Sequence, residues 1–257
     1  MKREIIKEIK VGIRSGKFMI LLASLVFYGL LTPIMLTVIL PKVLSSQFQG
    51  EDISALLNAM GTDQMATMTS YMSDIYEIGT LLVTFVLCGL IAQEIKDNTL
   101  VLPLCAGSRY HEIIGAKALV YSIFLLAASM LALSADYLYS GLIIDFEVGL
   151  GSVFTGGALQ GLYFSYLVVC VMMWGSLTKS PIAAGFLTLG TTYGMHFVAG
   201  LFQKSNWVPS GLMTQAANFS GNVSDSLLAT VGITVMIIMM MLAITQVRLG
   251  KLEWNGR

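Results

Sequence analysis

The chain has 257 residues, of which 56% are hydrophobic and only 12% charged, and its 15 basic and 15 acidic side chains cancel. A soluble domain usually carries about twice that share of charge, so the composition excludes an ordinary soluble enzyme and a basic nucleic-acid-binding domain. The hydrophobic residues are gathered in blocks, which is typical of a chain that crosses a membrane several times.

Residues 1–16 predict an amphipathic helix. Ile5, Ile6, Ile9 and Ile13 fall within about 100° of one another on a helical wheel, while Lys and Arg side chains take the other side. A basic amphipathic helix beside a span lies in the headgroup plane of the bilayer. We expect an interfacial helix, which serves either as an anchor alone or also as a contact for a cytoplasmic partner.

The hydrophobic blocks predict six transmembrane helices in a single domain covering residues 1–257. A helix needs roughly 20 apolar residues to cross the hydrocarbon core. The second block is short and must include Ile75 and Tyr76, which places Glu77 near one membrane face. The expected spans cover about 18–40, 75–93, 115–135, 153–177, 181–203 and 226–247.

The basic residues orient these spans. Lys and Arg mark cytoplasmic loops, and thirteen of the fifteen fall in the N-terminal segment, the second-to-third and fourth-to-fifth connections, and the C-terminal tail. The exceptions are Lys42 and Lys204. Both termini are therefore predicted to be cytoplasmic, in the cell membrane of what we expect to be a bacterium.

The predicted outside loops are acidic and contain Asp74, Glu77 and Asp136 among others. They form either an anionic vestibule for a cationic substrate or simply loops without Lys and Arg. In the longest of these loops, Met65, Met68 and Met72 lie at helical spacing. We expect them to form an apolar face against neighbouring spans or the membrane surface rather than a copper site, because no Cys or His lies nearby.

Two pairs of glycines and one histidine stand out inside the spans. Gly157 and Gly161, and likewise Gly190 and Gly194, form GxxxG pairs that allow close helix packing. His196 has no acidic residue deep inside the predicted spans to pair with, since Glu77 is expected near a membrane face, so we expect a neutral imidazole hydrogen-bonded to a neighbouring helix.

Motifs for chemistry are missing from the sequence. It contains no GxxxxGK[ST] phosphate loop, no HExxH, and no constellation that predicts a metal site or a catalytic centre. A membrane-embedded enzyme is therefore the weakest of the functional hypotheses. We expect the energy for any transport to come from outside this chain.

The segment between the second and third spans, QEIKDNTLVLPLCAGSRYHEIIGAK, is charged yet carries Leu100, Leu102, Leu104 and Ile113 in a predicted cytoplasmic loop. Apolar side chains of this density in water usually pack on something. They either lay a short helix into a groove on a soluble partner or pack as an interfacial segment on the protein's own spans.

The order of elements resembles the permease subunit of ABC transporters of the ABC-2 class. The resemblance rests on the topology and on a local motif between the second and third spans, where a Thr-Leu run ends in Ser-Arg and a Gly-x-Lys precedes the third span. In that family this segment includes the coupling helix, a short helix that docks onto a separate ATPase. Asn98 stands where the family usually has glycine, and Pro103 leaves the extent of the coupling helix open. By this resemblance the residues that dock the ATPase are Glu94, Asn98, Thr99, Leu100, Leu104, Ser108, Arg109 and Lys117.

The resemblance implies a function and partners. It implies the transmembrane subunit of an ATP-driven exporter, paired with an identical or related second permease and with two copies of a separate ATPase that binds ATP and Mg²⁺. The chain itself would bind no cofactor. A peptide, lantibiotic or drug is the expected cargo. The alternative from a different class is a stand-alone ion-coupled carrier or channel.

Overall fold

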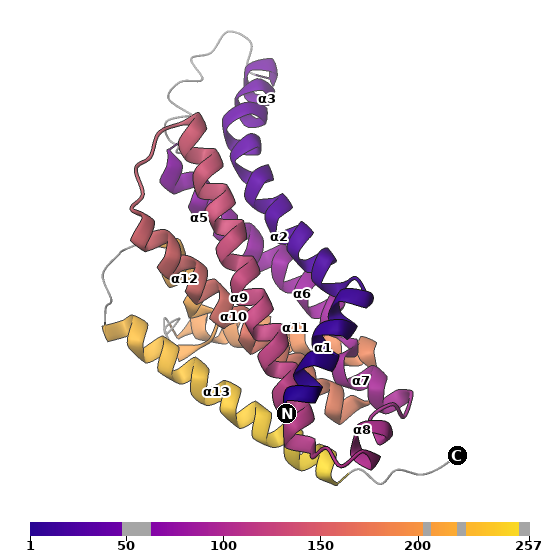
Figure 1. Cartoon of the computed structure of the whole chain (residues 1–257). Helices are drawn as coiled ribbons and strands as arrows, with labels where there is room; N and C mark the ends of the chain where they lie inside the picture. The colour runs from indigo at the N-terminus through magenta and orange to yellow at the C-terminus, as the bar shows by residue number, and fades with distance from the viewer. Residues whose placement is uncertain (48–62, 203–206, 220–224, 252–257) are drawn as a thin grey trace.

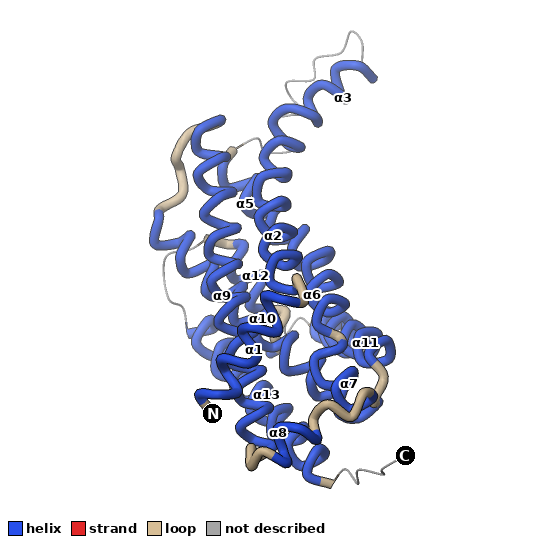
Figure 2. Tube along the Cα trace, turned by 45° about the vertical axis from the view of Figure 1, so that its right-hand side comes forward, coloured by secondary structure: helices blue, strands red, loops and turns tan. Residues whose placement is uncertain are grey.

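The computed structural model describes residues 1–47, 63–202, 207–219 and 225–251, and all regular structure in these ranges is helical. The helices form an elongated bundle (Figures 1 and 2). In chain order they are α1 Lys2–Arg14, α2 Lys17–Ile34, η1 Met35–Ile39, α3 Leu40–Gln47, α5 Gln64–Asp74, η2 Ile75–Gly79, α6 Thr80–Leu87, α7 Gly89–Lys96, α8 Val101–Cys105, α9 Tyr110–Ile143, α10 Leu150–Thr178, α11 Pro181–Leu201, α12 Gly211–Ala217 and α13 Asp225–Gly250.

Within the described residues, five continuous helical segments are long and apolar enough to cross a membrane. They are Lys17–Ser46, Gln64–Lys96, Tyr110–Ile143, Leu150–Thr178 and Asp225–Gly250. The all-helical class predicted from the sequence is thus confirmed, with five helices that could cross a membrane, whereas the predicted number of six spans is not. The predicted span missing from this set is the fifth, which corresponds to α11; this helix has 21 residues, but its threonines, its glycines and His196 lower its hydropathy.

Helix α10 is the centre of the bundle. Within its most apolar stretch 83% of the residues are buried, and it contacts α9, α11, α12 and α13 as well as α6 and α7. Gly157 and Gly161 face α9: an added Cβ would lie 3.2 Å from the Met130 Cα and 2.8 Å from the Leu126 Cα. The absence of side chains at these two positions therefore sets the close approach of α10 and α9.

The second span begins earlier than predicted. Its helix runs without a break from Gln64, and the first part, α5, packs on α9 and α12. Met68 and Met72 are buried in the core, so the methionine face packs on neighbouring helices, as expected. The apolar face, and not net hydrophobicity, keeps α5 in the bundle.

The third span ends later than predicted, and this corrects the position of Asp136. We expected Asp136 in an outside loop, yet α9 continues to Ile143 and Asp136 is fully buried within it. Polar residues at Ser129 and Ser140 share its buried side. Hydropathy does not predict the end of this helix correctly, because these polar side chains face protein rather than water.

A π-helical stretch follows Pro33 in the first span. Proline has no N–H for the helical ladder, and the irregular turn η1 begins two residues later, at Met35. The Thr37 hydroxyl donates to the Pro33 carbonyl at 2.7 Å. Local rearrangements of this kind let a membrane helix satisfy backbone groups that proline leaves free.

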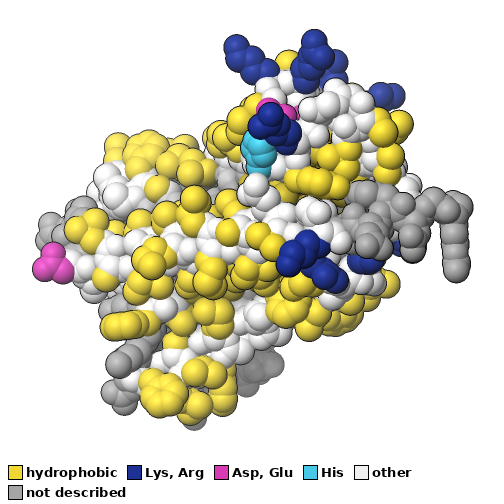
Figure 3. Space-filling model, turned by 90° about the horizontal axis from the view of Figure 1, so that it is seen from below, with side chains coloured by type: hydrophobic (Ala, Val, Ile, Leu, Met, Phe, Trp, Pro, Cys, Tyr) yellow, Lys and Arg dark blue, Asp and Glu magenta, His cyan; other side chains and the backbone are white. Residues whose placement is uncertain are grey.

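The N-terminus, α8 and the C-terminal end of α13 lie at one end of the bundle, while α3 lies at the other (Figure 1). We call the first the α8 end. Lys and Arg side chains are scattered over this end, where acidic ones are sparse (Figure 3).

Candidate functional site

A cluster of charged side chains is buried at the α8 end. The Lys117 ammonium on α9 donates to Glu8 of α1 at 2.9 Å and to Glu94 of α7 at 2.8 Å. Only 2% of the Lys117 side chain and 1% of the Glu8 side chain are exposed. Buried charges of this kind are retained only when they are paired, so the triad fixes three helices to one another.

The N-terminal helix is attached through its acidic face. Its buried residues are Glu4, Glu8 and Gly12, which follow one another at intervals of four and therefore share one side of the helix. Ser108, just before α9, donates its hydroxyl to Glu4 at 2.8 Å. Helix α1 thus contacts both α9 and the segment that follows α8.

The isoleucines predicted to face the membrane lie away from this attachment. Ile6, Ile9 and Ile13 are 54%, 40% and 58% exposed, and Ile5 is partly buried. Together with Leu119 and Ile123 of α9, some of them line an apolar groove of about 390 Å³. This surface suits contact with the edge of a bilayer.

The loop after the second span contains the short helix α8, Val101–Cys105. Pro103 is its third residue, where the backbone N–H would lack an intrahelical partner in any case. Asn98 and Gly107 flank the helix with positive φ angles of 55° and 86°. Glycine adopts this conformation readily, and asparagine is among the residues that tolerate it best.

The structure divides the predicted docking residues into two groups. Glu94 and Lys117 belong to the buried triad, and Leu100 is only 2% exposed, so these three side chains contact the chain's own core. Leu104 is partly buried and packs against the same core, and Ile113 lies within it. The accessible members are Asn98, Thr99 and Arg109, with Ser108 half-buried.

Leu102 is the exposed leucine of the run between the second and third spans. It is 74% exposed at the middle of α8, and the docking set deduced from the sequence did not include it. Of the two interpretations of the leucine run, packing on the protein's own spans therefore describes Leu100, whereas Leu102 remains available to a partner.

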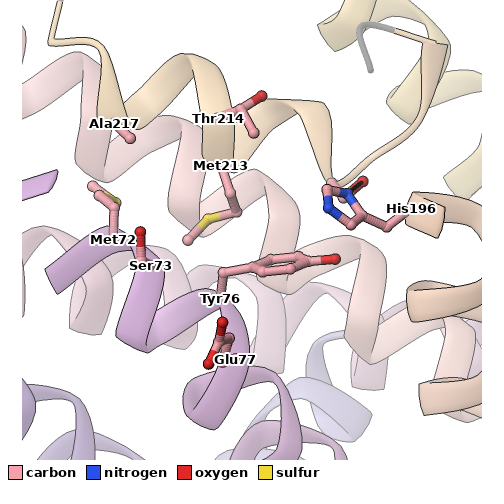
Figure 4. Close-up of a pocket in the computed structure, with 9 residues that line it drawn as sticks. Met72, Ser73, Tyr76, Glu77, His196, Met213, Thr214 and Ala217 are labelled. Carbon is pink, nitrogen blue, oxygen red and sulfur yellow. Dashed lines mark hydrogen bonds between the residues drawn. The ribbon is translucent and has the colours of Figure 1, made fainter. Parts of the chain in front are cut away.

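A second polar site lies around His196 (Figure 4). It is a cavity of about 230 Å³, which we call the His196 cavity. His196 Nδ1 lies 2.9 Å from the Ser210 hydroxyl, in agreement with the expected hydrogen bond, and the Tyr76 ring centre lies 5.1 Å from the imidazole. Glu77 lines the same cavity, so an aromatic wall and one carboxylate face it together.

The other glycine pair faces outward. An added Cβ at Gly190 or Gly194 would meet nothing within 4 Å, and both line a wide apolar groove of about 570 Å³ with Phe202 and Trp207. The described chain thus uses one GxxxG pair internally and leaves the other on its surface.

Sequence reasoning missed two sets of residues, Glu4 with Glu8, and Asp136. The signal for the first was available: two acidic residues four apart on an otherwise basic helix predict a face turned toward a cation. Asp136 gave no comparable signal, because a single aspartate near the end of a hydrophobic block is ordinary in a loop.

Neither a family model nor a curated protein sequence matches the chain significantly.

Proposed function

We propose that the chain is the membrane subunit of an ATP-driven exporter of the ABC-2 class, which receives force from a separate ATPase at its α8 end. The observation that most supports this proposal is that α1 is held near α8 by two buried glutamates, Glu4 bonded to Ser108 and Glu8 bonded to Lys117. The exposed Leu102 lies on α8 itself. A soluble motor that displaces α8 would pull on α7 and α9, which flank it in the chain, and on α1 through the Ser108–Glu4 hydrogen bond. The triad would make α1, α7 and α9 move together.

The absence of a phosphate loop from the sequence fits an exporter that uses a separate ATPase. In such an exporter the free energy for export comes from a protein that binds nucleotide differently in two states. Binding of that ATPase to α8 would couple its two states to the tilt of the spans. The cargo class, such as a peptide, lantibiotic or drug, follows from the resemblance alone, and the His196 cavity is the internal surface we assign to its passage.

The experiment is copurification with a candidate ABC ATPase, sought among the neighbouring reading frames. Leu102→Asp places a charge at the centre of the proposed interface and should abolish copurification and ATP hydrolysis by the complex. The matched control is Leu142→Asp, because Leu142 is equally exposed, at 77%, but lies at the C-terminal end of α9. Equal assembly of the two variants would refute docking at α8.

One observation favours a stand-alone ion-coupled carrier instead. Asp136 is fully buried, and neither carboxylate oxygen has a hydrogen-bond partner within the described chain. An ionisable group in such a place is a functional hypothesis by default. A carrier would transport in liposomes without any ATPase and lose transport in Asp136→Asn, whereas the exporter would be inactive without its ATPase in both forms.

A further inference from the structure

A second cavity of about 390 Å³ lies against the buried triad, and we call it the Lys17 cavity. Its lining includes four charged side chains, Glu8, Lys17, Glu94 and Lys117, and apolar ones such as Val86 and Leu90. The resemblance assigns Glu94 and Lys117 to ATPase docking, but neither it nor the proposed function assigns a ligand to the cavity.

The charges around this cavity are only partly satisfied by one another. Lys117 uses one oxygen of Glu8 and one of Glu94. The remaining oxygens, Glu8 Oε1 and Glu94 Oε2, accept no hydrogen bond in the described structure, although the Lys7 ammonium lies 3.8 Å from the former. Buried polar atoms without partners are rare in proteins, so these carboxylates favour an additional donor.

Lys17 supplies the opposite charge on the same cavity. It begins α2 and is half-buried, and among the described residues no carboxylate lies within ion-pairing distance of it. The cavity therefore offers carboxylate acceptors and a separate ammonium donor. A ligand that satisfies both must itself carry a hydrogen-bonding cation and an anion.

The position of the cavity selects a lipid. Lys17 begins one apolar helical segment, Glu94 lies in the last turn of another, and Lys117 lies about two turns into a third, which is close to the depth of the headgroups. Val86 and Leu90 lie further along the second span, toward its apolar part. An amphiphile would place its head among the charges and its chains beside these two residues.

We propose that the Lys17 cavity binds the headgroup of a phosphoethanolamine lipid. The primary ammonium would donate to the Glu8 and Glu94 carboxylates, and the phosphate would accept from Lys17. A choline headgroup has a cation with no N–H to donate, and a glycerol headgroup has no cation. The site should therefore distinguish these three headgroups. The proposal does not rest on the exporter function, because lipid binding needs no ATPase.

The experiment is native mass spectrometry of the purified full chain with equal amounts of phosphatidylethanolamine, phosphatidylcholine and phosphatidylglycerol of the same acyl chains. We expect the ethanolamine lipid to be retained about tenfold more than either of the others. Equal retention of the ethanolamine and choline lipids would overturn the proposal.

Variants locate the site. Lys17→Gln leaves the triad intact and should remove most of the selectivity, whereas Lys42→Gln, an exposed lysine on α3 at the other end, should retain it. Selectivity unchanged in Lys17→Gln would contradict the proposal. Glu94→Gln should weaken retention of the ethanolamine lipid specifically, with thermal stability measured alongside to identify any loss of folding.

A soluble headgroup tests whether the ligand is a lipid. O-phosphoethanolamine, added at the concentration of the lipid, should compete poorly because it lacks the acyl chains. Equal competition by the free compound would show that the cavity binds a water-soluble molecule and would overturn the lipid assignment.

Discussion

A lysine with 2% of its side chain exposed holds its charge where water cannot solvate it. Lys117 is stable there because two carboxylates lie within 3 Å of its ammonium, at 2.9 and 2.8 Å. Breaking a buried pair by removing one partner leaves an uncompensated charge, which typically costs about 3–5 kcal/mol. Removing Lys117 leaves two such carboxylates.

We therefore expect Lys117→Met to lower the free energy of unfolding by about 3–5 kcal/mol. Lys96→Met, at an exposed position at the end of α7, should change it by no more than about 0.5 kcal/mol. Titration of the protein in mild detergent with sodium dodecyl sulfate, followed by tryptophan fluorescence, measures both. Similar losses in the two variants would show that the triad contributes no special stability.

The two glycine pairs differ at the level of the helix, although the sequence presents them alike. The α10 pair lies against the α9 backbone, whereas the α11 pair borders open space. A close approach that depends on the missing side chain cannot accommodate even a methyl group without moving α9 or α10.

Gly161→Ala should consequently destabilise the chain by about 1–3 kcal/mol. Gly194→Ala should instead be neutral or stabilise α11 by up to about 1 kcal/mol, because alanine is the better helix former. The same detergent titration, performed on the isolated chain, compares them. If Gly194→Ala proved the more damaging, the packing assigned to α10 and α11 would be wrong.

At the scale of the whole molecule, the arrangement of the ends makes a prediction about sidedness. The N-terminus, α8 and the end of α13 share one end of the bundle, which the basic residues assign to the cytoplasm. If both ends of the described chain lie on that side, the number of crossings is even, and we therefore predict that α11 crosses as well, although it falls outside the five segments that qualify by length and composition.

Cysteine labelling tests this directly. Cys105, free and exposed on α8, should resist a membrane-impermeant maleimide in intact cells and react in inverted vesicles. A cysteine introduced by Leu142→Cys should show the reverse pattern, and mass spectrometry assigns the labelled sites. Labelling of Cys105 in intact cells would reverse the orientation and remove the basis for a cytosolic motor.

The sequence predicts a residue's location well only where its polarity matches its surroundings. Long apolar blocks predicted the helical class and most of the spans, because lipid and protein interior favour the same residues. The roles of Leu100 and Asp136 could not be predicted, because hydropathy does not distinguish a loop in water from a polar face turned inward. The sequence could predict that Glu8 faces a cation, but it could not predict which one, since the pairing with Lys117 joins residues more than 100 positions apart.

The central claim is that a soluble ATPase contacts α8, and photo-crosslinking from position 102 measures that contact. With a photoreactive amino acid in place of Leu102, in membranes that contain an ABC ATPase found to copurify with the chain, we predict a covalent adduct with that ATPase. The same probe in place of Leu142 should give none. An intact complex that forms adducts from position 102 with lipid alone would contradict the account.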